Sequence, residues 1–488
     1  MSQATIKTSV NGASGSSRSN DSLSSSHVHP APLMPGVPVL GNLLEAWRDP
    51  IDLFSEVASR GDVMELRFLR VRYFLLNDAE AIHHVLVDNN RNYTKSPSYK
   101  GLKLVMGEGL VTSEGEFWRR QRKLSQPAFH RDRVASFVTA MIDETDRMLE
   151  RWDTQVGQVL DVHAEMMKLT LRIVARTLFS TSVGPEADAI GEALGIALHH
   201  ANDYAESIVK PPQWLPTPKN FRFRRSLRTL DALVFRIIDS RRRGENADAN
   251  DLLALLMAAT EDGRGMTDRQ LRDEVMTLVM AGHETTANAL AWTFYLLSKD
   301  PEVERRLRRE VVGAIGDRAP QAEDAPRLKY TAMVVNESMR IFPPVWAFER
   351  QAREDDEVNG FRIPARSLVA ISPFLLHRHR DYWENPEGFD PERFSPERAE
   401  GRPRFAYLPF GGGPRQCIGM GFALTEAQVL LARIAQRFRL ELVSSRPPVP
   451  EPVVTLRPRD GLLMRVQRQA TPASEEGKPA LRVAEGRA

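Results

Sequence analysis

The sequence predicts a mainly helical protein with small β-sheets, an α+β class. Helical spacing of apolar residues covers most of the chain, and strand-type alternation is confined to three stretches, which together point to this class. The β-rich stretches are residues 63–76, 347–372 and 439–466. Helices are expected at residues 79–88, 116–125, 131–153, 160–178, 186–206, 222–242, 249–261, 267–298, 301–316, 327–341 and 419–438.

Both ends of the chain are expected to be disordered. Residues 1–29 are rich in Ser, Asn and Gly, and residues 468–488 are mostly polar, so neither end can bury enough apolar surface to fold. Ordered structure should begin near Pro35. The first residues contain neither a run of roughly 20 apolar residues nor the apolar stretch of a secretory signal. We therefore expect a soluble protein without a membrane anchor.

Charge and composition exclude one broad class. The chain has 66 Lys and Arg against 64 Asp and Glu, a net charge of +2, which argues against a nucleic-acid-binding protein. The 42% hydrophobic and 27% charged residues are typical of a soluble globular chain.

The residue pattern predicts the conformation of two further segments. Met64, Leu66 and Phe68 alternate with polar residues, and the same pattern returns after a short break, which predicts a β-hairpin over residues 63–76. Residues 209–220 contain four prolines, so they cannot form a helix and should join the helices on either side. This segment is either a plain exposed loop or a mobile lid.

The single cysteine, Cys417, lies in a run that is unsuitable for a core strand or a helix. Glycines, a proline and an arginine surround it between Phe410 and Gly419. A lone cysteine is usually a small buried apolar side chain. Here a tight loop would instead direct backbone N–H groups and a guanidinium at the sulfur, and such donors stabilise a thiolate. A thiolate ahead of a helix N-terminus is suited to axial ligation of haem iron.

The run resembles the haem-binding loop of the cytochrome P450 superfamily, of the soluble bacterial type. All the fixed positions of that pattern are present, namely Phe410, Gly413, Arg415, Cys417 and Gly419. A phosphate-binding glycine loop is the rival, but no Gly-Lys-Ser/Thr follows. The resemblance implies one catalytic domain over residues 30–467, with haem b between a long central helix and the helix after the cysteine. Cys417 would be the metal ligand, and Phe410, Gly411, Arg415 and Gly419 would contact the cofactor.

The segment 267–298 would form the long helix, roughly 48 Å in length. Its second half is apolar almost all round, so it should be buried, yet Glu284 and Thr285 lie in its middle, where polar groups need partners or a task. The run resembles the family's oxygen-binding pattern. That resemblance implies cofactor contacts at Ala281 and Gly282, where the glycine lets the helix approach the haem and the helix widens locally. It also implies catalytic roles for Thr285, which hydrogen-bonds to dioxygen, and Glu284, which relays protons.

His283 and Glu284 also suggest the zinc peptidase pattern His-Glu-x-x-His. The second ligand position is Ala287, so the pattern fails. We expect His283 to be a hydrogen-bonded histidine or one at the solvent edge.

Further motifs are expected around the cofactor. Trp118 and Arg122 share a helix face and suit the haem propionates, with Arg415 and Arg350 as further ligands and Lys95 as a weaker one. The resemblance implies a structural triad of Glu337, Arg340 and Arg393. Arg119, Arg120 and Lys123 should face outward, where a redox partner could dock.

The predicted function is that of a haem-thiolate monooxygenase acting on an apolar substrate such as a fatty acid or terpenoid. By resemblance, the substrate pocket would draw on the 96–111 loop, the middle of the long helix, residues 343–348 and the turn near Val454. Val345, Trp346, Ala347 and Phe348 are apolar, so the pocket should be hydrophobic. No flavin or ferredoxin module follows residue 467, so NAD(P)H electrons should arrive through a separate ferredoxin or flavodoxin in the cytoplasm. The alternatives are a haem-thiolate peroxygenase or isomerase, and a non-enzymatic haem-binding sensor.

Overall fold

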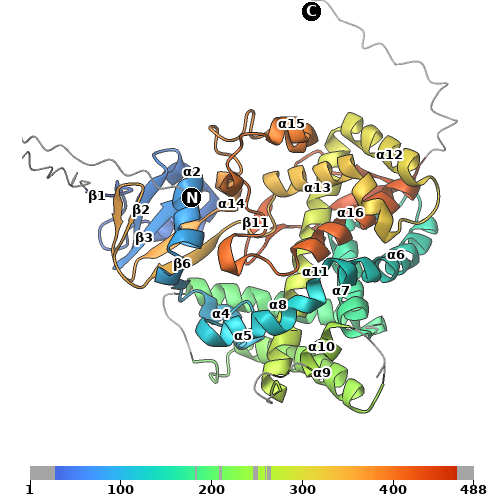
Figure 1. Ribbon diagram of the computed structural model, residues 1–488, viewed down its shortest axis with the longest axis horizontal. Helices are drawn as coiled ribbons and strands as arrows, with labels where there is room; N and C mark the ends of the chain where they lie inside the picture. Colours follow the sequence, from blue (N-terminus) through green and yellow to red (C-terminus); the bar gives the residue numbers. More distant parts are fainter. Residues whose placement is uncertain are drawn as a thin grey trace, which may run out of the picture.

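The computed structural model describes residues 28–181, 184–207, 212–245, 251–258, 260 and 265–469. The predicted disordered tails lie almost wholly outside these residues, as does the beginning of the proline-rich segment 209–220. Helices dominate the described part and the sheets are small, which confirms the predicted fold class. Strands β1, β2, β3 and β6 gather at one end of the molecule and most helices lie at the other (Figure 1).

The helices agree with the predicted pattern and add several short ones. Their bounds are α1 Leu43–Arg48, α2 Pro50–Ala58, α3 Ala79–His83, α4 Tyr99–Met106, α5 Gly115–Ser125, α6 Arg131–Asp153, α7 Val162–Phe179, α8 Ala187–Glu206, α9 Pro218–Arg242, α10 Leu252–Ala258, α11 Asp268–Lys299, α12 Pro301–Ile315, α13 Lys329–Ile341, α14 Pro373–Leu376, α15 Pro396–Ala399 and α16 Met420–Arg437. The helix predicted at 79–88 changes after α3 into a π-helical turn, His84–Asp88. Helices α1, α2, α4, α14 and α15 were not predicted.

The strands confirm the three β-rich stretches. Their bounds are β1 His29–Pro30, β2 Val63–Phe68, β3 Val71–Leu76, β4 Tyr93–Lys95, β5 Val159–Asp161, β6 Phe348–Ala352, β7 Asp356–Val358, β8 Phe361–Ile363, β9 Leu368–Ile371, β10 Phe438–Leu442, β11 Pro450–Pro452, β12 Leu456–Pro458 and β13 Leu463–Arg468. The largest sheet has the order β2-β3-β9-β6-β4, and the predicted hairpin forms its β2–β3 edge. β10-β13-β5, β1-β8-β7 and the hairpin β11-β12 are separate.

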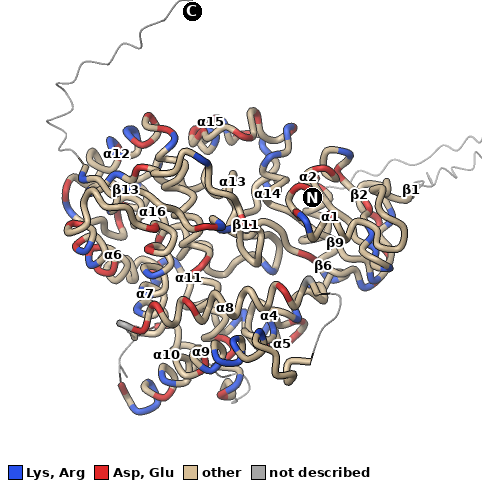
Figure 2. The backbone as a smooth tube through the Cα atoms, turned by 180° about the vertical axis from the view of Figure 1, so that it is seen from behind, with Lys and Arg blue, Asp and Glu red and all other residues tan. Residues whose placement is uncertain are grey.

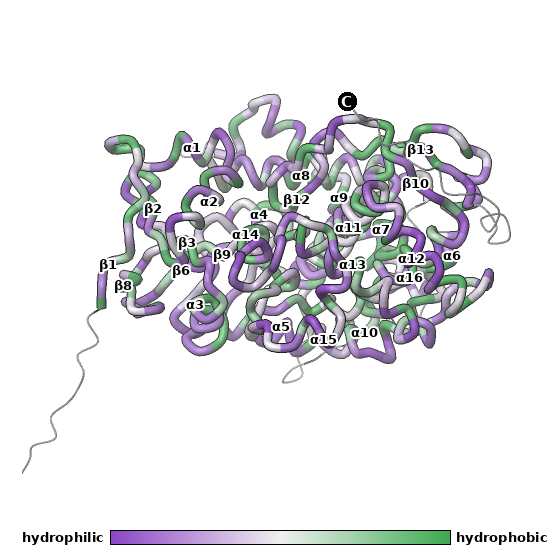
Figure 3. Tube along the Cα trace, turned by 90° about the horizontal axis from the view of Figure 1, so that it is seen from above, coloured by the Kyte–Doolittle hydropathy of each residue, from purple (hydrophilic) through white to green (hydrophobic). Residues whose placement is uncertain are grey.

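Helix α11 runs through the centre of the helical part. A capping box starts it, because the Thr267 hydroxyl accepts from the Gln270 N–H while the Gln270 side chain accepts from the Thr267 N–H. From Leu271 onward most of its side chains are buried, as predicted. Helix α7 packs along it, and α16 packs against α6. Hydrophobic segments concentrate along these inner helices (Figure 3).

The five-stranded sheet has a hydrophobic core on each face and brings two distant basic residues together. Apolar side chains from its two faces form two smaller cores, separate from the helical one. Antiparallel pairing of β4 with β6 sets Lys95 opposite Arg350, although 255 positions separate them in the sequence. Among the described helices, none combines the length and apolar composition of a membrane span.

Candidate active site

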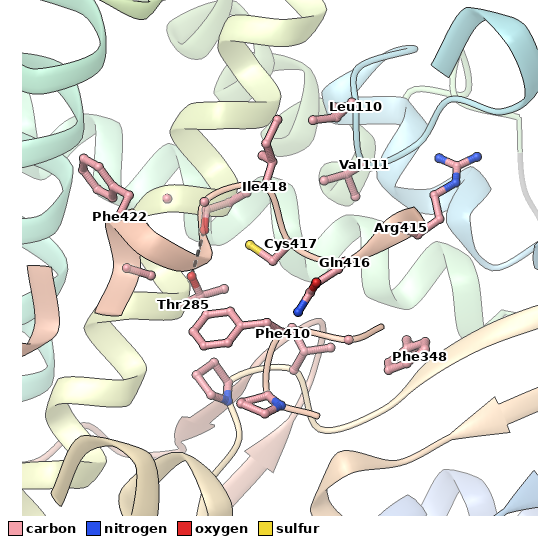
Figure 4. Close-up of a pocket in the computed structure, with 18 of the residues that line it drawn as sticks. Leu110, Val111, Thr285, Phe348, Phe410, Arg415, Gln416, Cys417, Ile418 and Phe422 are labelled. Carbon is pink, nitrogen blue, oxygen red and sulfur yellow. Dashed lines mark hydrogen bonds between the residues drawn. The ribbon is translucent and has the colours of Figure 1, made fainter. Parts of the chain in front are cut away.

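A cavity of about 310 Å³ lies between the middle of α11 and the loop that leads into α16. Its walls come from distant parts of the chain: the loop after α4, helix α5, helix α11, residues 344–350 and residues 408–423. Most of the lining side chains are apolar. The fold therefore builds one mainly apolar site around Cys417 (Figure 4).

The cysteine loop depends on glycine at position 413. Gly413 has a φ of +66°, and a Cβ there would lie 1.9 Å from the carbonyl oxygen of Leu86. The Cys417 N–H donates to the carbonyl oxygen of Phe410 at 2.9 Å, which closes the loop. From α5, Arg122 Nη1 donates to the carbonyl oxygen of Gln416 at 2.8 Å. These contacts leave the Sγ of Cys417 facing the cavity (Figure 4).

Two opposing effects act on the Cys417 thiol. Burial raises its pKa above the ordinary value, whereas the Gly419 N–H and the Arg122 guanidinium lower it. The predicted donors are thus present, and burial outweighs them. A metal ion bound to the sulfur would reverse this balance, because a coordinating thiol is deprotonated.

Three cations meet at one side of the cavity. Arg415 pairs with Glu114 at 2.9 Å and lies 3.8 Å above the Trp118 ring. Burial, with Arg350 and Arg415 nearby, holds the pKa of Lys95 well below its usual range, and Glu114 only partly offsets this. Burial lowers the pKa of Arg415 to about 10. Glu114 is thus the carboxylate near both Lys95 and Arg415, and the three basic side chains Lys95, Arg350 and Arg415 repel one another in the buried wall.

This donor set fits haem b. Its two propionates are carboxylates that could pair with Lys95, Arg350 and Arg415. Its iron binds a thiolate, and its ring packs against apolar side chains. Every residue predicted to contact the cofactor lines the cavity: Cys417, Arg415, Phe410, Gly411, Gly419, Trp118, Arg122, Arg350, Ala281 and Gly282. Within this set, Trp118 joins the cation cluster, while Arg122 lies closer to the cysteine loop.

Thr285 faces the cavity, and its hydroxyl donates to the Ala281 carbonyl oxygen at 2.8 Å (Figure 4). Gly282 lines the cavity and has a second use in packing. A Cβ there would lie 3.0 Å from the Val174 side chain, so the glycine also allows α7 to cross α11 closely. The expected local widening is not seen, since α11 is a continuous α-helix.

Glu284 is buried and, among the described residues, does not line the cavity. Its Oε1 accepts from the Thr455 hydroxyl at 2.7 Å, and that hydroxyl accepts from Asn288 Nδ2 at 3.1 Å. His163 Nε2 lies 2.8 Å from Asn288 Oδ1. Burial raises the pKa of Glu284 above its usual value. The predicted catalytic pair is therefore divided, with Thr285 inside the cavity and Glu284 behind it.

The prediction for His283 is wrong. Its side chain is 1% exposed, and neither ring nitrogen has a hydrogen-bond partner among the described residues. Burial lowers its pKa to about 3. The residue is thus a neutral histidine in the core, neither hydrogen-bonded nor at the solvent edge.

The implied triad is assembled in the core. Glu337 and Arg340 are both fully buried, and Arg340 Nε and Nη2 donate to the two Glu337 oxygens at 2.7 and 2.8 Å. Arg393 Nε donates to Glu337 at 3.3 Å. Arg340 also donates to the carbonyl oxygens of His377 and Gly388, each at 2.9 Å. The triad therefore ties α13 to the loops that precede the cysteine segment.

The predicted substrate residues divide into two groups. Val345 and Phe348 line the cavity. Trp346 donates to the Val453 carbonyl oxygen at 2.9 Å and, with Ala347, packs against the core beneath the sheet. Val454 packs against the helical core. Within the described chain, Trp346, Ala347 and Val454 do not line the cavity.

Tyr99, Leu110 and Val111 line the cavity from the predicted 96–111 loop, and Thr277, Leu278, Thr286 and Ala289 line it from the predicted long helix. Phe129, Leu178 and Phe422 also line it and were not predicted. Thr277 and Leu278 precede Ala281 by one helical turn, so helical spacing could have indicated them. Behind Thr286 lies Glu426 of α16, which is fully buried, and burial raises its pKa to about 8.

Comparison with known proteins assigns the family. The model of the family described as Cytochrome P450 matches residues 30–464. Cyclooctatin synthase from Streptomyces melanosporofaciens is 40% identical, over 86% of this chain and 92% of the relative. Cyclooctat-9-en-7-ol 5-monooxygenase from the same organism is 37% identical, over 83% and 88%. The crystal structure of the cytochrome P450DA heme domain superposes with a TM-score of 0.83 at 27% identity, covering 91% of this chain and 98% of that one. The chain therefore belongs to the cytochrome P450 family, as a haem b monooxygenase that inserts one atom of dioxygen into an apolar organic substrate with electrons from a redox partner.

Proposed function

We propose that this enzyme oxidises a terpenoid, bound in the apolar cavity between Cys417 and Thr285. The observation that carries the proposal is that the cysteine sulfur and the threonine hydroxyl face the same apolar space, with the cation cluster at its side. Both bacterial relatives are named for terpenoids, cyclooctatin and cyclooctat-9-en-7-ol. We favour terpenoids over the fatty acids that the sequence also allowed.

The residues that would hold the cofactor follow from the charges. Cys417 Sγ would bind the iron, and Lys95, Arg350 and Arg415 would bind the propionates, with Trp118 beneath Arg415. When bound, haem b supplies the redox chemistry that activates dioxygen. Besides its predicted role as a propionate ligand, Arg122 would stabilise the thiolate, because its guanidinium lowers the pKa of Cys417.

Thr285 and Glu284 would handle protons. The Thr285 hydroxyl donates to Ala281 at rest, and turning about χ1 would release it toward the cavity. Glu284 would pass a proton to this side only after turning from Thr455. Burial favours the neutral carboxyl group and so raises the pKa of Glu284, which suits a group that passes protons.

A ferredoxin or flavodoxin in the cytoplasm stays the predicted electron donor. Arg119 and Lys123 on α5 are exposed, and Arg119 pairs with Glu116. Arg120 is half-buried, so it does not face fully outward as predicted. Lys and Arg colour much of α5 in the reverse view (Figure 2). This helix carries the cavity-lining Trp118 and Arg122, so a partner bound there would lie close to the cofactor.

The test combines spectroscopy with product analysis. Reduced wild-type protein with carbon monoxide should absorb well to the red of a histidine-ligated haem, and Cys417→Ser should lose that band. With NADPH and surrogate redox partners, wild type should oxygenate a terpenoid from a screening panel. A band that survives in Cys417→Ser would contradict the ligand assignment. Product formed with hydrogen peroxide alone, at the same rate, would favour the peroxygenase alternative.

A further inference from the structure

Glu284, the acid that we propose to supply protons, is held by a side chain from a distant part of the sequence. Thr455 lies in the turn between β11 and β12, and its hydroxyl donates to Glu284 Oε1 at 2.7 Å. Thr455 is 5% exposed and Glu284 is 4% exposed. Water screens a hydrogen bond between two such buried groups only weakly, so this contact fixes where the resting carboxyl group lies.

Two further hydrogen bonds set the direction of this contact. Asn288 Nδ2 can only donate, and it donates to Thr455 Oγ1 at 3.1 Å, which leaves the hydroxyl hydrogen of Thr455 for Glu284. Asn288 Oδ1 can only accept, so His163 Nε2, at 2.8 Å, carries its hydrogen. Every donor in this chain of contacts thus faces toward Glu284. Such an arrangement favours the carboxylate over the neutral carboxyl group.

The turn that carries Thr455 is fixed both to the cavity wall and to the central helix. The Leu456 N–H donates to the carbonyl oxygen of Pro344, a lining residue, at 2.9 Å. The Leu456 carbonyl oxygen accepts from Trp292 Nε1 of α11 at 3.0 Å. These bonds are immediately next to Thr455 in the chain, so they hold its hydroxyl at a fixed place beside α11.

Burial and the polar neighbours of Glu284 act on it in opposite directions. Burial raises its pKa, whereas the Thr455 hydrogen bond and the Arg457 guanidinium lower it. Burial lowers the pKa of both His163 and His283, so neither histidine adds a positive charge at neutral pH. A buried carboxyl group without such donors would bind its proton too firmly to pass it on.

We propose that Thr455 is a positioning residue for proton delivery: its hydroxyl holds the Glu284 carboxyl group behind the cavity wall and stabilises the carboxylate that remains once the proton has left. The inference rests on the proposed role of Glu284. The proton passes from Glu284 to the Thr285 hydroxyl oxygen, while Thr285 gives its own hydroxyl hydrogen to the dioxygen that the partner's electrons reduce. The carboxylate then returns to Thr455 and takes its next proton from solvent.

Infrared titration of the holoenzyme tests the contact directly. Difference spectra of each protein with and without Glu284→Gln isolate the band of the neutral Glu284 carboxyl group, and the loss of this band with rising pH gives a midpoint. A hydrogen bond to a charged group changes a pKa by about one to two units. Thr455→Val keeps the shape but removes the donor, so it should raise the midpoint by about one to two pH units. Thr455→Ser should restore the wild-type midpoint.

Product formed per NADPH tests whether the contact serves proton delivery. It is measured across the same pH range with surrogate redox partners and a terpenoid that wild type oxidises in the screening panel. A proton donor acts only in its protonated form, so the yield should fall as the pH rises through the Glu284 midpoint. This fall should move upward with the infrared midpoint in Thr455→Val and stay in place in Thr455→Ser.

Thr293→Val is the matched control on α11. Its hydroxyl is bonded to the Ala289 carbonyl oxygen and, among the described residues, it does not line the cavity. It should therefore give the infrared midpoint and the pH profile of wild type.

The outcomes separate this inference from the role of Glu284. An unchanged infrared midpoint in Thr455→Val overturns the inference, and so does a midpoint that moves while the fall in yield stays where it was, since the contact is then structural only. If Glu284→Gln has a wild-type yield at every pH, the proposed proton role is wrong and the inference falls with it. A loss of yield in Glu284→Gln without any change in Thr455→Val removes the inference alone.

Discussion

Replacing Glu337 by glutamine removes the counter-charge of two buried guanidinium groups. The Glu337 oxygens accept from Arg340 at 2.7 and 2.8 Å, from Arg393 at 3.3 Å and from the Asp390 N–H at 2.9 Å. Glutamine keeps the shape of the side chain but not its charge. Removing one partner of a buried ion pair costs about 3–5 kcal/mol. We therefore expect Glu337→Gln to lower the free energy of unfolding by that amount.

This loss can be converted into a temperature shift. At roughly 2.1 cal/mol/K per residue, the unfolding entropy over the matched residues 30–464 is about 0.9 kcal/mol/K. The thermal midpoint should then fall by about 3–6 °C. Circular dichroism should be followed together with haem absorbance, because a bound cofactor can separate the two transitions.

An exposed pair with the same spacing provides the control. Glu302 and Arg305 form an i, i+3 ion pair on α12 with both side chains more than half exposed. Such a pair contributes about 0–1 kcal/mol, so Glu302→Gln should shift the midpoint by no more than about 1 °C. If Glu337→Gln also shifts the thermal midpoint by no more than about 1 °C, the triad does not stabilise the fold as its geometry implies.

Three further predictions concern the site. Thr285→Ala should keep haem and substrate binding but lose product per electron by roughly tenfold or more, with peroxide released instead; unchanged coupling would exclude the hydroxyl from proton transfer. The pKa of about 8 for Glu426 lies above the unfolded value near 4.3, so the folded state binds the extra proton and stability should fall by up to about 4 kcal/mol between pH 4.5 and 8; Glu426→Gln should remove this fall in unfolding midpoints measured across that range, and an equal slope in both proteins would contradict it. The double change Arg119→Glu with Lys123→Glu should slow reduction by an acidic partner about tenfold at low salt, with peroxide-supported turnover unchanged; equal rates across a salt titration would show that α5 is not the docking surface.

Most of the elements that the sequence predicted correctly are indicated by patterns within short segments. The predicted helices 131–153 and 267–298 agree with α6 and α11 within one residue, because both have a long apolar period and clear ends. The cysteine loop was predictable because its spacing is fixed within ten residues. Contacts between distant segments were less accessible. That Lys95 would meet Arg350 depends on the register of β4 against β6, which neither segment reveals alone.

The middle of α11 shows why direction was harder to predict than burial. Successive helical residues differ by about 100° in direction, so four adjacent residues cover the whole circumference. Thr285 therefore faces the cavity, while Glu284 faces Thr455 and His283 is enclosed in the core. The sequence predicted that the polar groups in this helix need hydrogen-bond partners. It did not predict which of them would be bonded to other protein groups.

That distinction makes the hydrogen-bond state of each threonine informative. A buried hydroxyl without a partner costs about 1–3 kcal/mol, and bonding to the preceding turn is available to any helical threonine. Thr293 takes that bond and, among the described residues, does not line the cavity. Thr285 takes it too, but at a position where turning about χ1 would expose the hydroxyl. The same side chain thus differs in its surroundings along α11: at Thr293 the hydroxyl closes the helix on itself away from the cavity, and at Thr285 it makes the same bond at the cavity wall, where we propose that it can turn toward dioxygen.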